Sequence, residues 1–500
     1  MLNPFKGIPN KSEVFAWGMY DLANQSFTLL IITLLFSRYV QQVVTLHPPE
    51  PEAAALVAGG AEPESLTADQ QAELAAYEDA VTEADNRGKF NWSLMHGSTL
   101  LCVFALSPLL GAIGDAKGWR KRLLVVTGLL CSALTASLFF VGPGMIVVAA
   151  LLYIPANFCF QIGENFLASF LPEVSTPRTL GKVSAIGWTM GYVGALALLV
   201  VSAGITQAAG LTEATDWPPL FVFAGAWFFF GMIPAVVVLR KDKAAESIRK
   251  RDVLGVAIGR VSDTFRHARR YRELVKFLIA FLVYGFGVQV IIGFASIIAK
   301  DFGIESTTQL IIFVAQITIT AGISSWVTGL FQDKIGVRPT VLIYLVIWLV
   351  SSGALLGVTL GFPDGGPQWP IWVIGNGLGF ALGGIGTSSR SMVARFTPAH
   401  RRAEFFGLWG MVYKLAGGLG VLAFGAIAEV FGNVASLGFL TGTFAFGLVL
   451  MLPVREVAGV CAARRAERAV GIGRRDMPTP CDEPASVGGS ASAGGSTAIS

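Results

Sequence analysis

The sequence GAIGDAKGWRKR at residues 111–122 returns, in a looser form, as GLFQDKIGVRPT at residues 329–340. The second copy begins 218 positions after the first, almost half the length of this 500-residue chain. Glycine lets a helix end approach its neighbour closely, aspartate can face the positive end of an adjoining helix, and basic residues hold a loop at a membrane surface. A duplicated structural unit is therefore predicted, with matched positions Gly111, Asp115, Gly118 and Arg120, then Gly329, Asp333, Gly336 and Arg338.

The composition is that of a membrane protein. Hydrophobic residues make up 53% of the chain and charged residues only 14%, whereas soluble domains carry about 25% charged residues. Apolar runs of about 20 residues, each long enough to cross a bilayer core, recur along the whole sequence. They predict an all-α integral membrane protein with twelve transmembrane helices, near residues 14–42, 92–114, 123–141, 145–171, 184–206, 219–239, 274–299, 309–332, 340–360, 370–394, 404–430 and 434–453.

The basic residues alternate with the predicted spans. If the N-terminus is cytoplasmic, the loops on that side hold nearly all the lysines and arginines, and the opposite side holds Arg87, Lys89 and Lys300, with Arg38 near a helix end. This asymmetry is the positive-inside pattern. It predicts that both termini are cytoplasmic, in a multi-pass protein expected in a bacterial inner membrane.

The longest cytoplasmic segment divides the chain into equal sets of six spans. We expect an N-terminal six-helix bundle at 1–239, a basic linker at 240–273, a C-terminal six-helix bundle at 274–453 and a disordered tail at 454–500. The linker is either a helix on the inner headgroups or a solvated segment. The acidic outer loop 46–90 is expected to hold a short solvated helix, and acts either as a solubilising insert or as charge near the entrance.

The repeated turn has the pattern G-x-x-x-D-x-x-G-x-R, which resembles the signature loop of the major facilitator superfamily. FAWGMYDLANQSF at 15–27 is similar to the opening of its vacuole-effluxer-like branch, and 165–194 and 388–420 look like later blocks of that branch. The resemblance implies two six-helix bundles around a central cavity, working by alternating access, with the repeated turns as conformational loops. Fungal members of the branch are associated with amino-acid export.

Among the ionisable residues inside apolar spans, four stand out: Asp21, Glu164, Arg390 and Lys414. Each such group costs about 2.5–3.5 kcal/mol on insertion scales, so each needs a partner or a function. Spans four and ten face each other in a major facilitator fold, so Glu164 and Arg390 are expected to form an inner gate, with a static pair as the alternative. Asp21 or Glu164 is expected to carry a coupling proton, with sodium as the other candidate ion.

Lys414 is the strongest candidate for substrate contact, because a lone ammonium deep in a span can hold a carboxylate. The alternative is a structural ion pair with Asp21 or Glu164. Further substrate-binding candidates come from the polar and aromatic residues near the intramembrane charges: Asn24, Tyr20, Gln161 and Tyr413.

The predicted function is a secondary active transporter of a small polar metabolite, favouring an amino acid or related carboxylate. A pump is disfavoured because the sequence has no G-x-x-x-x-G-K-[ST] loop, and an enzyme because its four histidines are scattered. A non-transporting sensor and a sugar or lipid transporter stay as alternatives. We expect a monomer in the lipid bilayer, with no cofactor, no metal and no nucleic-acid partner.

Overall fold

The computed structural model describes residues 8, 10–176, 179–240, 271–362, 366–398 and 401–469. Within these ranges the chain forms helices and no strands. The predicted linker 240–273 falls mainly on residues 241–270, which lie outside the described part, as do the tail after residue 469 and the Asp115 side chain.

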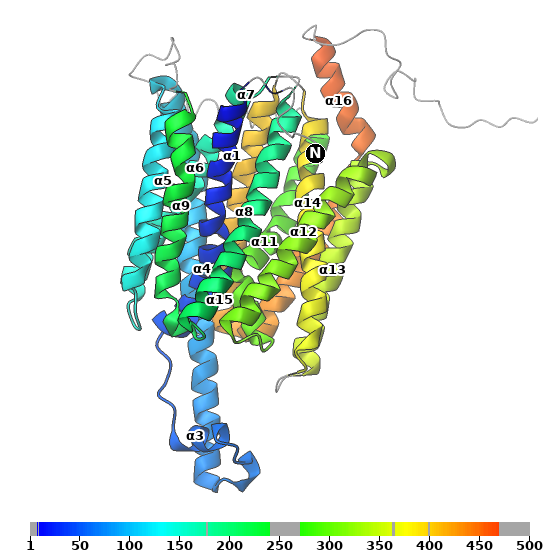
Figure 1. Cartoon of the computed structure of the whole chain (residues 1–500). Helices are drawn as coiled ribbons and strands as arrows, with labels where there is room; N and C mark the ends of the chain where they lie inside the picture. Colours follow the sequence, from blue (N-terminus) through cyan, green and yellow to red (C-terminus); the bar gives the residue numbers. More distant parts are fainter. Residues whose placement is uncertain are drawn as a thin grey trace, which may run out of the picture.

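The first half begins with a span of mixed winding, and its later helices follow regularly (Figure 1). Span one starts as α1 (Lys11–Gln25), continues as the π-helix η1 (Ser26–Leu35), and ends with α2 (Phe36–Tyr39) and the π-helix η2 (Val40–Val44). The other helices of this half are α3 (Glu52–Ala58), α4 (Ala68–Lys117), α5 (Arg120–Ser137), α6 (Ile146–Ser169), α7 (Leu171–Val174), α8 (Leu180–Ala209) and α9 (Pro218–Val238). Three short 3-10 turns complete it: η3 (Pro63–Ser65), η4 (Leu138–Phe140) and η5 (Ala214–Asp216).

The second half repeats this plan. It consists of α11 (Arg272–Asp301), α12 (Thr307–Ile335), α13 (Val337–Gly361), α14 (Trp369–Phe396), α15 (Arg402–Met451) and α16 (Glu456–Ala469). Helices pack mainly within their own half, and the halves meet where α4 lies against α15, α8 against α12, and η1 against α11. The helical fold of a multi-pass membrane protein is confirmed.

Eleven helices of the described ranges are long and apolar enough to cross a membrane. One of them, α15, covers the eleventh and twelfth predicted spans. Its backbone is non-helical at Gly432, where φ is 79° and ψ is −178°, so this glycine separates two spans inside one 50-residue element. Twelve spans are therefore accommodated in eleven apolar helices.

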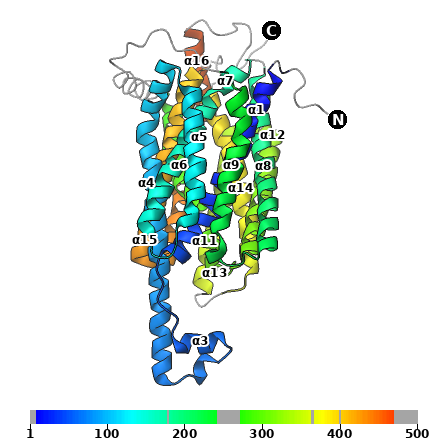
Figure 2. The same ribbon diagram turned by 60° about the vertical axis from the view of Figure 1, so that its left-hand side comes forward.

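The two corner turns share a backbone feature as well as a sequence. Gly118 ends α4 with φ of 62°, and Gly336 precedes α13 with φ of 96°. Only glycine adopts such conformations readily, which explains why both copies keep it. Both turns lie at the end of the bundle that carries α7 and α16, which we call the α16 end. In Figure 2, α1 begins at this end and α3 lies at the opposite one, the α3 end.

Two predictions about the polar segments need correction. The acidic outer loop does hold a separate short helix, α3, but its segment from Ala68 onward is the first part of α4 and runs without interruption into span two. Thr67 starts this helix with a reciprocal capping box to Gln70. The tail is not disordered from residue 454, since Glu456–Ala469 form α16, which contacts α14 and α11.

Candidate functional site

A cluster of polar side chains lies where the two halves meet. Its carboxylates and amides come from the first half, on α1 and α6, and its cations come from the second half, on α14 and α15. Residues that the sequence places far apart are thus brought together across the interface. The members predicted from the sequence are Asp21, Asn24, Gln161, Glu164, Arg390, Tyr413 and Lys414.

Lys414 is the centre of the first group of contacts. Its ammonium donates a hydrogen bond to Oε1 of Gln161, lies 5.8 Å from the centre of the Tyr413 ring, and is in electrostatic contact with Glu164. Glu164 in turn accepts a 2.8 Å hydrogen bond from Nδ2 of Asn24. The amide oxygen of Asn24 is buried and has no hydrogen-bond partner among the described residues. The group therefore combines a cation, a carboxylate and an open acceptor.

Arg390 forms a second group beside the first. Its guanidinium lies 5.9 Å from the centre of the Trp409 ring and is in electrostatic contact with Asp21 and Tyr192. In this arrangement Asp21 is in electrostatic contact with both Glu164 and Arg390, and Glu164 is in electrostatic contact with Lys414. The gate between Glu164 and Arg390 stays a prediction.

Sequence reasoning missed a polar chain that leads from Lys414 into the first half. Gln161 donates to Oδ1 of Asn157 at 3.2 Å, and Nδ2 of Asn157 lies 3.1 Å from Nδ1 of His96. The same ring nitrogen lies 2.7 Å from the hydroxyl of Tyr153. The sequence carried one usable signal, because Asn157 and Gln161 are four residues apart and share a helix face.

Tyr20, a substrate-binding candidate from the sequence, is in electrostatic contact with Glu164, but its direct partners lie within the first half. Its side chain is buried, its hydroxyl donates to the carbonyl of Leu124 at 3.4 Å, and its ring packs edge-on against Phe228. These partners belong to α5 and α9 of the same half. Tyr20 therefore contacts the interior of the first bundle.

The repeated turns bind nearby segments of their own halves. Arg120 pairs with Glu173 of α7 at 2.7 Å, and Asp333 pairs with Arg395 at the end of α14 at 2.6 Å. Gly111 and Gly329 lie inside α4 and α12, and an added Cβ would contact nothing at either position. The first turn is thus joined to α7 by an ion pair, and the second turn is joined to the end of α14 in the same way.

Charged side chains join the halves at the α3 end. Lys89 lies 2.9 Å from Oδ2 of Asp301, and Lys300 lies 2.9 Å from both carboxylate oxygens of Asp85. Arg38 donates to the carbonyls of Ile304 and Glu305 at 2.6 and 2.7 Å. These contacts hold the two halves together at the end that the basic-residue pattern predicts to be external.

Asp85 lies on the extension of α4, before the predicted span. Burial raises the pKa of this carboxyl, but the hydrogen bond from His47 and the charge of Lys300 lower it by more. The pKa of Asp85 is therefore below its ordinary value, and the carboxylate is charged under physiological conditions. Within the described residues, no group of three or more His, Cys, Asp or Glu side chains is placed to hold a metal ion.

The sequence matches a family described as "Vacuole effluxer Atg22 like" over residues 9–463. An MFS-type transporter of Bacillus subtilis, YxiO, is 24% identical over 452 residues, covering 88% of this chain and 94% of the relative. Autophagy-related protein 22 of Saccharomyces cerevisiae is 23% identical over 407 residues, covering 73% of this chain and 76% of the relative.

Solved transporters share the fold. A D-xylose–proton symporter aligns with a TM-score of 0.63 at 13% identity, over 90% of this chain and 99% of the symporter. The inward-open xylose transporter XylE of E. coli aligns with a TM-score of 0.59 at 12% identity, over 89% and 95% of the two chains. At these identities the likeness concerns the fold alone.

Proposed function

The chain belongs to the Atg22-like vacuole effluxer family, and we propose that it carries an amino acid or a related small carboxylate across the membrane by ion-coupled alternating access. Family and fold together identify a transporter of the major facilitator type. Its cargo and its coupling ion are the subject of the proposal.

The opposition of charges across the interface supports an amino-acid cargo. The second half presents the ammonium of Lys414, which suits a carboxylate, and the first half presents the carboxylate of Glu164, which suits an ammonium group. The unpartnered oxygen of Asn24 adds an acceptor next to Glu164. A zwitterion bound between them would touch both halves at once, as alternating access requires.

A neutral sugar bound between Lys414 and Glu164 would separate these charges without offering either of them an opposite charge. Buried charges that lose a partner cost several kcal/mol, so a site built for a sugar would not be expected to set an ammonium against a carboxylate. The xylose symporter shares the fold of this chain, but we do not propose a sugar as the cargo.

The two carboxylates of the cluster also suit ion coupling. Asp21 interacts with Glu164 of its own half and with Arg390 of the other, and Glu164 interacts with Lys414 across the boundary between halves. A carboxyl that exchanges a proton changes its attraction for the facing cation, and so couples protonation to the separation of the halves. We further propose that Glu164 changes partner from Lys414 to Arg390 in the state open at the α3 end, which is the predicted gate.

Binding of candidate cargo to the purified protein tests the proposal. We expect amino acids to raise the thermal stability of the wild type in a concentration-dependent way, and neutral sugars to leave it unchanged. Lys414→Gln should weaken the apparent affinity at least tenfold, which is the loss of one charged hydrogen bond. Lys334→Gln removes an exposed ammonium at the α16 end and is the matched control.

A measurement of amino-acid exchange across a membrane completes the test of the proposed function. Proteoliposomes loaded with a stabilising amino acid should exchange it in the wild type and lose most of that exchange in Lys414→Gln. Equal binding by wild type and Lys414→Gln would contradict the assigned role of Lys414. Binding without any flux under every ion gradient would instead favour a non-transporting sensor.

A further inference from the structure

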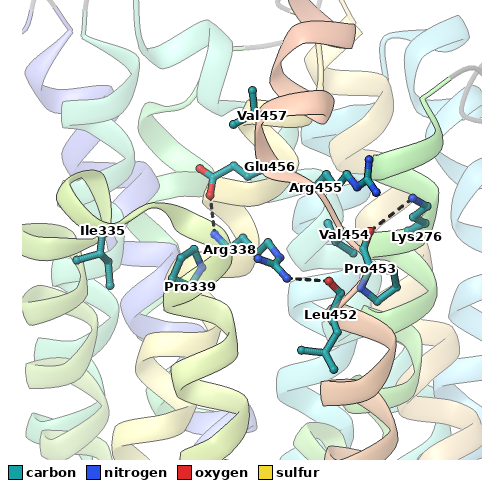
Figure 3. Close-up of a pocket in the computed structure, with 10 residues that line it drawn as sticks. All are labelled: Lys276, Ile335, Arg338, Pro339, Leu452, Pro453, Val454, Arg455, Glu456 and Val457. Carbon is teal, nitrogen blue, oxygen red and sulfur yellow. Dashed lines mark hydrogen bonds between the residues drawn. The ribbon is translucent and has the colours of Figure 1, made fainter. Parts of the chain in front are cut away.

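A pocket lies at the α16 end, away from the cluster between the halves. Its volume is about 690 Å³, within the roughly 300–1,000 Å³ of small-molecule sites. Three segments of the second half line it: the start of α11, the turn from the end of α12 into α13, and residues 452–457, which run from the end of α15 into α16 (Figure 3). The transport interface contributes none of its walls.

Three basic side chains, one from each segment, line this pocket: Lys276, Arg338 and Arg455. Arg338 donates from Nη2 to the carbonyl of Leu452 at 2.7 Å, while its Nε is buried and has no hydrogen-bond partner among the described residues. Lys276 pairs with Glu273 at 2.7 Å, and the Arg455 side chain is exposed. An unsatisfied guanidinium N–H beside two further cations suits an anion with several acceptor oxygens.

The acidic residue on the wall does not neutralise these cations. The Glu456 carboxylate accepts the backbone N–H groups of Val337 and Arg338 at 3.1 and 2.9 Å, and it also pairs with Arg395 at 3.0 Å. Its negative charge is thus directed at the start of α13 and at a cation outside the pocket. Glu273 pairs with Lys276 and accepts the backbone N–H of Arg455 at 2.6 Å, so the positive character of the pocket comes from the side chains of Arg338 and Arg455.

Apolar side chains surround the basic ones. Ile335, Leu452 and Val457 are 45%, 53% and 62% exposed, and all three line the pocket. They lie where the spans end, which is where headgroups would be expected in a bilayer, next to α16 with its exposed Arg464 and Arg465. A site for a soluble anion needs no such apolar rim, whereas a lipid presents a phosphate and acyl chains together.

We propose that this pocket binds the phosphate headgroup of an anionic phospholipid of the cytoplasmic leaflet. The phosphate oxygens accept from Arg338, Lys276 and Arg455, and the first part of an acyl chain lies against Leu452 and Ile335. The bound lipid connects α11, α13 and the segment before α16. Because Arg338 belongs to the second repeated turn, the lipid also stabilises that turn in the position seen here.

Native mass spectrometry of the full chain in detergent measures this binding without any transport assay. The probes are palmitoyl-oleoyl phosphatidylglycerol and phosphatidylcholine, which share their acyl chains. We expect preferential retention of phosphatidylglycerol by the wild type. Lys276→Gln with Arg455→Gln should weaken that binding about 25-fold, at roughly fivefold for each cation removed. Arg455→Gln alone, at an exposed position, should weaken it about fivefold and guards against misfolding of the double variant.

The matched control removes the same number of charges from the same end of the protein. Arg464→Gln with Arg465→Gln should change phosphatidylglycerol binding less than twofold. An equal loss in this control would overturn the site, because diffuse surface charge would then explain the preference. Equal retention of the two lipids would overturn it as well. Displacement of the lipid by millimolar inorganic phosphate would identify a soluble anion as the occupant, and would also contradict the proposal.

Discussion

The ammonium of Lys89 lies 2.9 Å from a carboxylate oxygen of Asp301, and this ion pair joins the two halves of the protein. The side chains are 4% and 15% exposed, so both charges are largely removed from water. Lys89 also donates to Oδ1 of Asn433 at 3.2 Å. One lysine therefore connects span two of the first half to both the first and the last span of the second half.

Removal of this lysine should loosen the closed α3 end. We expect Lys89→Gln to lower the free energy of unfolding by about 3–5 kcal/mol, because it leaves the largely buried carboxylate of Asp301 without its cation. Thermal denaturation of the purified protein measures the loss. Arg87→Gln, two residues earlier on α4 with a side chain 57% exposed, should cost only about 0–1 kcal/mol. Similar losses in the two variants would show that Lys89 is not a specific connection between halves.

Acid should weaken the contact between Asp85 and Lys300. The folded-state pKa of Asp85 lies below its ordinary value of 3.8, so the stabilisation is complete above that value and is lost as the pH falls through the folded-state pKa. Wild-type stability should therefore fall more steeply than that of Asp85→Asn as the pH is lowered from 5 to about 2. Unfolding monitored across this range tests the difference. Parallel pH profiles would rule out a contribution from this carboxylate.

Gly432 should tolerate no side chain. Its φ of 79° with ψ of −178° is a combination that essentially only glycine adopts, so Gly432→Ala should cost about 1–3 kcal/mol. Gly438→Ala lies six residues later inside the helix, where an added Cβ would meet no atom within 4 Å, and should be neutral or stabilising by about 0.5–1 kcal/mol. The folded yield and melting temperature of the two variants provide the comparison. Equal behaviour would mean that the junction can re-form without glycine.

Glu456 should hold α16 against the second repeated turn. Its side chain is 16% exposed and accepts two backbone N–H groups of α13, so Glu456→Ala leaves those donors unsatisfied at about 1–3 kcal/mol. Tryptic cleavage at Arg464 and Arg465 should then become several-fold faster. Asp333→Asn is the control, because the Asp333 carboxylate is 74% exposed and its pair with Arg395 contributes little. Unchanged cleavage in Glu456→Ala would indicate that other contacts hold the helix.

The fold followed from features that need only one sequence. The apolar runs, the placement of basic residues and the turn written twice were sufficient for the helical architecture, because each reports a local requirement of the bilayer. Whether neighbouring helical segments join without a break was harder to predict from the sequence. The uninterrupted α4 could not be predicted, since a helix formed in water and one formed in lipid show no boundary where they join. The two spans of α15 were predicted, but not that Gly432 alone separates them.

The charged residues of the candidate site were predicted because each is costly by itself, and Asn24, Gln161 and Tyr413 because they are close to those charges in the sequence. Lys414 and Glu164 stand out in apolar spans because charges there need partners. His96 and Asn157 did not, because their importance depends on which helix faces meet, and α4 and α6 are brought together only in three dimensions. Which residue pairs with each charge depends on the same packing. A single sequence does not reveal this packing, because it contains no correlated substitutions.

The continuity of α4 has a mechanical consequence. A helix of 50 residues is about 75 Å long, and this one passes from its acidic tip beyond the bundle into the membrane without a break in its helical geometry. Such a helix is stiff, and Lys89, which contacts Asp301 of the second half, lies near its middle. Under the proposed alternating access, a molecule bound to the tip would act directly on the contact between the two halves, and a fluorophore attached there would report their relative motion.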